Sequence, residues 1–202
     1  MGYDDEFTAC ADELLAKGEP FDVVVANAGV MATPFGHTVD GFETQFGTNH
    51  LGHFVLVNRI APLIRTGGRL INLSSAGQRR SNVDLDDPNF EPDALRTFCC
   101  LWRSKTANIP FAVAFDERHR KNGIRAAAVY PGGIRTEIAR YMDPSCLEAL
   151  VDDINKQLAT EGKPPFEFKT SPKGPQPQYG LVQLPRLTRS AGVIARIATS
   201  VT

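Results

Sequence analysis

Apolar residues follow two patterns along this chain: segments with helical spacing and short, continuously apolar runs. The clearest run, FDVVVANAG from Phe21 to Gly29, is β-branched and ends in turn-forming residues, which is typical of a strand buried in a parallel sheet. Two more runs, Arg69–Ser75 and Ile124–Tyr130, alternate with helical patterns. This order predicts an α/β fold with a parallel sheet and right-handed crossovers. The helices are expected at Asp4–Lys17, Val39–Ile64 and Ser104–Lys121.

Length and charge narrow the class of protein. The chain has 202 residues, 42% of them hydrophobic, and a net charge of -1, which suits one core or part of a larger one. A near-neutral balance argues against nucleic acid as a partner, because phosphate binding needs clustered positive charge. No apolar run approaches the roughly 20 residues that cross a bilayer, so we expect a cytoplasmic protein without a membrane span. The four cysteines form no CxxC pair, and we expect neither a metal site nor disulfides.

Three segments rich in Gly, Ser or Asn follow the expected strands: NAG after the first, SSAG at the end of the second and PGGIRTE after the third. In open parallel sheets, ligands bind beyond the carboxyl ends of the strands, so these segments are the candidates for chemistry. Each one alone is also an ordinary turn sequence, because turns use Gly and Asn. Their position at the ends of successive strands favours the functional interpretation.

The motifs ANAGVMATP, FGTNHLGHF, RLINLSSAG and YPGGIRTE, with the pair Ser104-Lys105, resemble the short-chain dehydrogenase/reductase family. The similarity is to its retinol-dehydrogenase-like and WW-domain-oxidoreductase-like branch, and it runs from about Asp12 to about Thr170. It implies a partial Rossmann-type doubly wound parallel sheet over residues 1–170. It also implies an NAD(P)-dependent oxidoreductase that acts on a small-molecule alcohol or carbonyl by hydride transfer. The sequence does not decide between NAD and NADP. A homodimer through the helices around Asn49 and Lys105 is possible.

The resemblance also implies roles for particular residues. The catalytic Asn, Ser and Lys of the family correspond to Asn49, Ser75 and Lys105, and Lys105 would also contact the ribose of the cofactor. Further cofactor-binding positions correspond to Asn27, Ala28 and Gly29, which would stabilise the central sheet beside the adenosine, and to Pro131, Gly132 and Thr136, which would face the nicotinamide.

The chemistry of carbonyl reduction accounts for such a set of residues. Hydride transfer leaves an alkoxide, so the site needs a proton donor and hydrogen bonds aimed at that oxygen. A Ser hydroxyl supplies one bond, a Tyr supplies the proton when a neighbouring Lys lowers its pKa from about 10, and the Asn holds a water against the Lys. Each residue also has a simpler interpretation: Ser75 caps the strand end, Asn49 caps a helix beginning near His50, and Lys105 is a solvated lysine. The four histidines show no ligand-like spacing and are assigned no chemistry.

Three departures bear on activity. No glycine-rich TGxxxGxG loop precedes Phe21, so by resemblance the first βαβ half is missing and the edge of the first strand should be unprotected. The position four residues before Lys105 holds Leu101 instead of Tyr, and loss of positioned acid-base catalysis costs roughly 10²- to 10⁴-fold in rate. Pro110, inside the helix that carries Lys105, should kink that helix or cost about 3 kcal/mol.

Residues 171–202 form a basic, proline-rich segment without acids, so we expect an irregular tail and a doubtful last strand. A frameshift is one hypothesis for both oddities. Codons chosen for Ala94–Trp102 read Pro-Tyr-Glu-Pro-Ser-Ala-Ala-Tyr-Gly one base later, and codons chosen for Val182–Ala198 give a family-like ending with Gly-Gly-Arg-Tyr-Cys-Glu-Asp. Resequencing the locus separates this hypothesis from a decayed gene or a divergent protein. The alternative function is a non-catalytic remnant or binding protein derived from the family.

Overall fold

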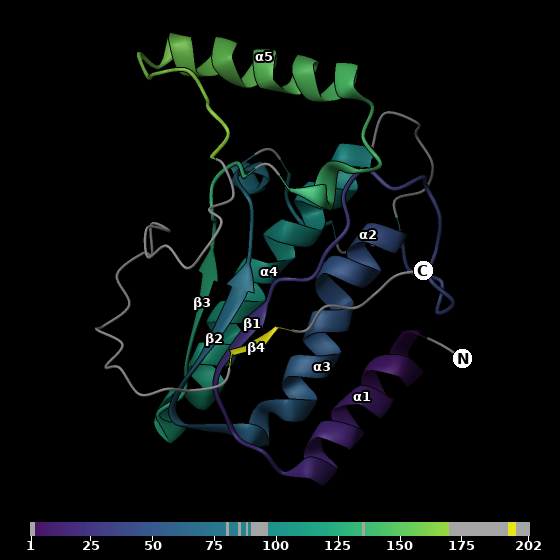
Figure 1. The fold of residues 1–202 in the computed structure, drawn as a ribbon, viewed down its shortest axis with the longest axis vertical. Helices are drawn as coiled ribbons and strands as arrows, with labels where there is room; N and C mark the ends of the chain where they lie inside the picture. Colours follow the sequence, from purple (N-terminus) through teal and green to yellow (C-terminus); the bar gives the residue numbers. More distant parts are fainter. Residues whose placement is uncertain are drawn as a thin grey trace.

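The computed structural model describes residues 3–79, 81–84, 86–87, 89, 97–134, 136–169 and 194–196. Its strands form a parallel sheet in the order β3-β2-β1-β4 (Figure 1). The predicted parallel α/β fold is confirmed, and the three strands expected from the sequence lie side by side as β1, β2 and β3. The bounds are β1 Phe21–Ala26, β2 Ile64–Leu73, β3 Arg125–Val129 and β4 Ile194–Arg196.

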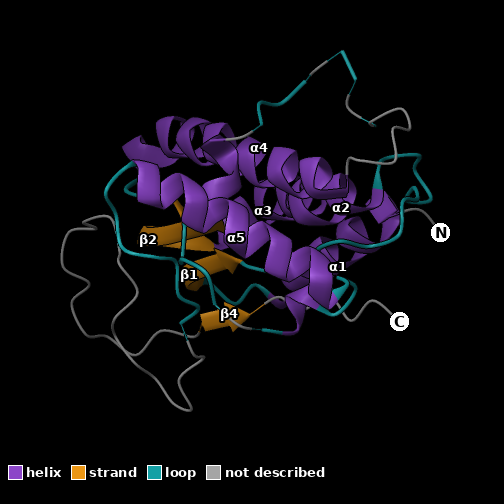
Figure 2. Cartoon of the chain, turned by 90° about the horizontal axis from the view of Figure 1, so that it is seen from above, coloured by secondary structure: helices purple, strands orange, loops and turns teal. Residues whose placement is uncertain are grey.

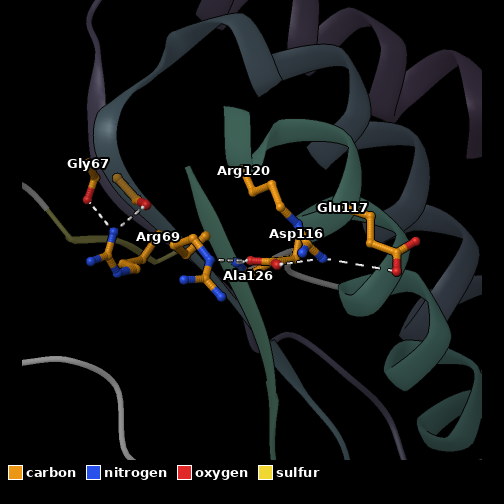
Figure 3. Close-up of polar contacts among 8 residues, drawn as sticks. Gly67, Arg69, Asp116, Glu117, Arg120 and Ala126 are labelled. Atoms are coloured by element: carbon orange, nitrogen blue, oxygen red, sulfur yellow. Dashed lines mark hydrogen bonds and ion pairs between the residues drawn. The ribbon is translucent and has the colours of Figure 1, made fainter. Parts of the chain in front are cut away.

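Strand β2 begins earlier than the sequence predicts, because it includes a glycine-rich irregularity. Its register with β1 shifts near its start, where Gly67 has a φ of +87° and a Cβ on Gly68 would lie 2.8 Å from the backbone oxygen of Arg65. Arg69 donates to the carbonyls of Gly67, at 2.5 Å, and Gly68, at 2.9 Å (Figure 3). Both glycines are therefore required by the backbone path into the regular part of β2.

Helices α1 (Tyr3–Lys17), α3 (Gly52–Ile60) and α4 (Thr97–His119) lie on one side of the sheet (Figures 1 and 2). The main hydrophobic core lies between these helices and the strands, and a Cβ on Gly52 would come 2.5 Å from the Phe7 ring, so α1 and α3 pack closely. Among the described residues, one of the two helical layers of a doubly wound sheet is present. Fully buried core residues include Ala11, Val24, Leu56, Ile60 and Leu70.

The helix expected at Val39–Ile64 begins only at Thr44, so the prediction is wrong for its first five residues. Glu43 caps it, because its carboxylate accepts hydrogen bonds from the backbone N of Gln45, at 2.9 Å, and of Phe46, at 2.7 Å. The prediction is also wrong at its last residue, because Ile64 begins β2. The helical path runs through α2 (Thr44–Phe46), a π-helical turn (Gly47–Leu51), α3 and a 3₁₀ turn (Ala61–Leu63).

Helix α4 starts before the predicted Ser104 and continues through Pro110 as one helix. Since proline has no N–H, the carbonyl of Thr106 loses its usual helical donor at that point. The helix continues as a 3₁₀ turn, Arg120–Asn122, and stops at Gly123, whose φ of +77° is the left-handed conformation of a helix C-terminus. The predicted stop near Asn122 and Gly123 is confirmed.

Strand β4 covers the outer edge of β1. Residues 23–25 of β1 pair in parallel with Ile194–Arg196, so the expectation of an unprotected edge is wrong for this part of the strand. β4 also lies inside the segment 171–202 that the sequence predicts to be irregular. The rest of that segment lies outside the described residues.

Helix α5 (Pro144–Thr160) extends across the molecule beyond the carboxyl ends of the strands (Figure 1). Asp143 caps it by accepting a hydrogen bond from the backbone N of Ser145 at 2.8 Å, and Pro144 occupies the first helical position. The sequence analysis did not predict this helix. In the described part of the chain, no helix has both the length and the apolar character needed to cross a membrane.

A charged cluster fastens the end of α4 to β3 (Figure 3). Asp116 of α4 is buried and accepts hydrogen bonds from Arg125 Nε, at 2.7 Å, and from the backbone N of Ala126, at 2.9 Å. Its other oxygen lies 3.4 Å from the guanidinium of Arg120. Burial alone raises the pKa of Asp116, but the bonds from Arg125 and Ala126 outweigh this effect, so its pKa lies below the ordinary value.

Replacing Asp116 with Asn is expected to lower the free energy of unfolding by about 1–3 kcal/mol at pH 7, because charge-assisted bonds to β3 are lost. Glu117→Gln is the matched control, since Glu117 is exposed and reaches Arg120 only at 4.0 Å; it should cost less than about 0.5 kcal/mol. Urea unfolding as a function of pH measures both.

The sign of the pH dependence follows from the lowered pKa of Asp116. Its contribution is present above the unfolded pKa of about 3.9 and is lost as pH falls through the lower folded value. The difference in free energy of unfolding between wild type and Asp116→Asn should therefore stay constant at neutral pH and decrease only in acid, below about pH 4. A gap that narrows already between pH 7 and pH 5 would contradict this assignment.

Candidate active site

Asn49 ties the loop after β1 to the helical segment that follows it. The residue is fully buried in the π-helical turn, where its Oδ1 accepts from the backbone N of Val30 at 2.8 Å and its Nδ2 donates to the carbonyl of Val30 at 3.0 Å. Asn49 lies inside the helical segment and its amide points to Val30, so the interpretation as a helix cap near His50 is wrong. Its predicted role in holding a water remains a prediction.

Gly29, Asn49 and Lys105 come together at the carboxyl end of β1. A Cβ built on Gly29 would lie 2.8 Å from Asn49 Oδ1 and 3.5 Å from Lys105 Nζ. No side chain fits at residue 29 without displacing the Asn49 amide. Of the other two residues of the NAG segment, Asn27 is exposed and Ala28 is half-buried.

Lys105 is a buried ammonium, with only 5% of its surface exposed, on the face of α4 towards Gly29 and Asn49. Burial lowers its pKa from 10.5 to about 8. Among the described residues no carboxylate pairs with it, and burial is the sole cause of the shift. The interpretation as a solvated lysine is therefore wrong. A buried cation without an anion is unfavourable for stability, and such groups are concentrated at functional sites.

Two histidines that the sequence analysis left without a role lie near Lys105. Burial lowers the pKa of His53 to about 4 and also lowers that of His50, and the positive charge of Lys105 acts in the same direction on both. Both rings are therefore neutral at pH 7. His53 Nδ1 donates to the carbonyl of Asn49 at 3.1 Å, and His50 Nδ1 lies 2.8 Å from Asn108 Oδ1.

Asn108 is a buried polar residue that the sequence analysis missed. It lies on α4 three residues after Lys105, and its Nδ2 donates to the carbonyls of Asn49, at 3.2 Å, and Leu73, at 3.0 Å. Its position one helical turn from Lys105 was the signal that could have drawn attention to it.

Ser74 and Ser75 have different surroundings at the end of β2. Ser74 is buried and donates to the carbonyl of Lys105 at 2.8 Å, which joins β2 to α4. Ser75 Oγ accepts from the backbone N of Gly77 at 3.2 Å, as the capping interpretation expects. Because that bond uses a lone pair, the hydroxyl proton of Ser75 remains able to donate to another oxygen. The geometry therefore suits both interpretations of Ser75.

Leu101 lies on α4 one turn before Lys105 and is buried. Its backbone oxygen accepts from Ser104 Oγ at 2.7 Å, and the same Ser104 Oγ accepts from Asn49 Nδ2 at 3.3 Å. The backbone of Leu101 is thus linked through Ser104 to Asn49, but the leucine side chain, unlike the tyrosine expected at this position, carries no proton for transfer.

The segment after β3 is held by a different part of the chain. Gly132 has a φ of +88°, and a Cβ on it would lie 3.2 Å from Lys169 Nζ. The carbonyl of Gly133 accepts from the backbone N of Lys169 at 2.9 Å. Thr136 is exposed, and its Oγ1 accepts from the backbone N of Ile138 at 3.4 Å. Pro131, Gly132 and Thr136 thus follow β3 as predicted, while their roles towards a cofactor remain predictions.

Comparison with known proteins assigns the chain to a family. Residues 2–87 match the family model described as enoyl-(acyl carrier protein) reductase. Human retinol dehydrogenase 14 is 31% identical over 187 residues, which cover 91% of this chain and 53% of that protein. Human retinol dehydrogenase 13 is 37% identical over 133 residues, or 65% of this chain and 40% of that protein. The chain belongs to the short-chain dehydrogenase/reductase family. The resemblance expected from its motifs, to the retinol-dehydrogenase-like branch, is confirmed.

A solved structure supports the fold of this short-chain dehydrogenase/reductase chain. An uncharacterized protein from Mycobacterium paratuberculosis matches with a TM-score of 0.58 at 34% identity, covering 68% of this chain and 50% of that one. A short-chain dehydrogenase from Burkholderia cenocepacia J2315 shares the fold with a TM-score of 0.57 at 19% identity, covering 83% and 60%. The chain spans about half the length of the curated relatives it matches.

Gly29→Ala is expected to lower the free energy of unfolding by about 1–3 kcal/mol, because the methyl group would push the Asn49 amide away from Val30. Gly36→Ala is the matched control: its Cβ would lie 3.5 Å from Thr44 Oγ1, an ordinary contact. It should change stability by less than about 1 kcal/mol in either direction. Urea unfolding of the two variants tests this, and equal effects would count against the close packing at Gly29.

Lys105→Met is expected to raise the free energy of unfolding at pH 7 by on the order of 3 kcal/mol, because it removes a buried cation whose pKa falls from 10.5 to about 8. Between those two pH values the unfolded chain holds a proton that the folded chain has released. Wild-type stability therefore rises with pH relative to Lys105→Met, and the gap closes by about pH 10.5. Lys121→Met, at an exposed position beyond α4, is the control. A gap that does not change with pH would contradict the buried, charged state of Lys105.

Proposed function

We propose that this chain is the catalytic half of an NAD(P)-dependent oxidoreductase that interconverts an alcohol and a carbonyl compound by hydride transfer. The observation that carries the proposal is the Lys105 ammonium, buried beside Gly29 and Asn49 without an anionic partner among the described residues. A positive charge held in a water-poor site stabilises negative charge that develops on a reacting oxygen.

The residues around Lys105 suit a nicotinamide dinucleotide. The cofactor supplies or accepts the hydride. Among the described residues no hydrogen bond uses the Lys105 ammonium, so its protons could donate to ribose hydroxyls. Gly29 has no side chain, which leaves room for Asn49 Oδ1 and Lys105 Nζ beside the end of β1. Pro131, Gly132 and Thr136 would face the nicotinamide. The choice between NAD and NADP is left to the binding measurement.

Each polar residue has a separate task in this proposal. Ser75 donates its hydroxyl proton to the substrate oxygen; the bond from the backbone N of Gly77 uses one lone pair of Oγ and leaves that proton available. Lys105 supplies positive charge near that oxygen. Asn49 positions a water next to Lys105, while its own amide stays bound to Val30. The family membership, through relatives named as retinol dehydrogenases, makes an apolar alcohol or aldehyde the first substrate class to test.

Leu101 favours a second candidate function, a non-catalytic binding protein derived from the family. The side chain one turn before Lys105 is buried and carries no dissociable proton. In that case the site would bind a dinucleotide or a similar hydroxyl-rich ligand without proton transfer. A cytoplasmic location and a homodimer also remain predictions for this chain.

The test is Leu101→Tyr in the full chain, assayed for NADPH-dependent reduction of all-trans-retinal. A tyrosine beside Lys105 restores a proton donor and is expected to raise the rate roughly 10²- to 10⁴-fold over the unchanged chain. Leu101→Phe is the matched control, because it adds the ring without the hydroxyl and should not raise the rate.

Binding of NADPH and NADH to the unchanged chain, followed by nicotinamide fluorescence, separates the two functions. Saturable binding together with a gain in Leu101→Tyr supports the enzyme. Saturable binding without any gain supports the binding protein. The absence of binding at millimolar cofactor would refute both uses of the Lys105 site.

A further inference from the structure

Asn108 joins three elements around Lys105. Its Nδ2 donates to the carbonyl of Leu73, at the end of β2, and to the carbonyl of Asn49, in the π-helical turn. Its Oδ1 accepts from His50 Nδ1 at 2.8 Å, and its own backbone oxygen accepts from Asn72 Nδ2 at 3.2 Å. The side chain is fully buried. It therefore uses both amide protons and its carbonyl oxygen inside the protein.

These bonds fix the orientation of the Asn108 amide. Carbonyl oxygens only accept, so the group facing Asn49 and Leu73 must be the NH₂ group, and the oxygen must face His50. His50 then carries its proton on Nδ1. Since burial lowers the pKa of His50, the ring is neutral near pH 8 and adds no charge beside Lys105.

The same bonds fix the position of the α4 turn that carries Lys105. Asn108 is three residues after Lys105 on α4, so its amide holds this turn of the helix against β2 and against Asn49. Ser74, the residue after β2, adds a bond to the carbonyl of Lys105 itself. Among the described residues, Asn108 and Ser104 are the two α4 side chains that hydrogen-bond to Asn49, so without Asn108 the Ser104 bond would remain.

We propose that Asn108 is a positioning residue of the site: it holds α4 against β2 and against the turn that contains Asn49, and so keeps the Lys105 ammonium at Asn49 and Gly29, away from bulk water. This inference rests on the proposed function of the Lys105 site, which it deepens. The simpler possibility, a buried amide that contributes stability alone, predicts the same bonds but no effect on Lys105.

The test follows the titration of Lys105 in the full chain through its ¹³Cε NMR shift, assigned by its loss in Lys105→Met. Asn108→Ala is compared with Asn72→Ala. Asn72 is equally buried in β2 and donates to the backbone oxygen of Asn108, whereas the side-chain bonds of Asn108 go to His50, Asn49 and Leu73. The pKa of His53 is about 4 and that of His50 is lowered, so neither ring titrates together with Lys105 near pH 8.

The proposal expects the Lys105 midpoint in Asn108→Ala to rise from about 8 by roughly one pH unit or more, towards 10.5, because water reaches the ammonium. Asn72→Ala should lower the melting temperature and leave the midpoint unchanged. Asn108→Ser, which keeps one donor, should give a smaller rise and guards against loss of folding in Asn108→Ala.

Equal midpoints in folded wild type and Asn108 variants would overturn the proposal. So would unfolding of both Asn108 variants while Asn72→Ala stays folded, because the residue would then be a determinant of folding only. The Lys105 titration is measured without any catalytic turnover, so the two proposals can fail separately. If Leu101→Tyr is inactive but the Lys105 midpoint rises in Asn108→Ala, the proposed enzyme is refuted and the positioning role of Asn108 is supported.

Discussion

The burial of the Lys105 ammonium is the constraint on which the arrangement at the carboxyl ends of the strands depends. A cation that leaves water loses a large hydration free energy, and its pKa of about 8 reflects that loss. No carboxylate among the described residues compensates for it. The cation is buried because neighbouring groups fill the space around it: a side chain on Gly29 would collide with Asn49, and the Asn49 amide is bound to Val30.

Asparagine amides, more than apolar packing, set the geometry around this charge. Asn49 binds the loop after β1, and Asn108 binds β2 and the π-helical turn at once. An amide offers donors and an acceptor in one plane, so a fully satisfied buried amide fixes both the distance and the orientation of the elements it joins. Apolar contacts in the main core hold α1, α3 and α4 on the sheet but are not directional. The two kinds of contact thus have separate tasks.

The sequence predicted the strands and the residues at their ends because those signals are local. The run DVVVA reads as a strand by itself, and the Ser104-Lys105 pair is recognisable without its partners. The start of the helix at Thr44 was missed because its cap is a glutamate, Glu43, outside the usual capping residues. The spacing of Asn108 from Lys105 could have drawn attention to it, but its bonds could not be predicted, because its partners Asn49 and Leu73 lie 59 and 35 residues away in the chain. β4 was missed for the same reason, since its pairing with β1 depends on tertiary contact.

Leu101 changes what the buried charge can do. In the family pattern a tyrosine stands at this position, and the lysine ammonium beside it lowers the pKa of the phenol. The buried Leu101 side chain has no ionisable group that could interact with the Lys105 charge. In the proposed function, the positive charge of Lys105 would then act directly on the ligand oxygen. In the proposed function, binding of an oxygen-rich ligand would depend on Lys105 and Asn49, whereas proton transfer would depend on the side chain at position 101. The two proposed tasks, ligand binding and catalysis, therefore rest on different side chains, and loss of the proton donor would leave the physical basis for binding in place.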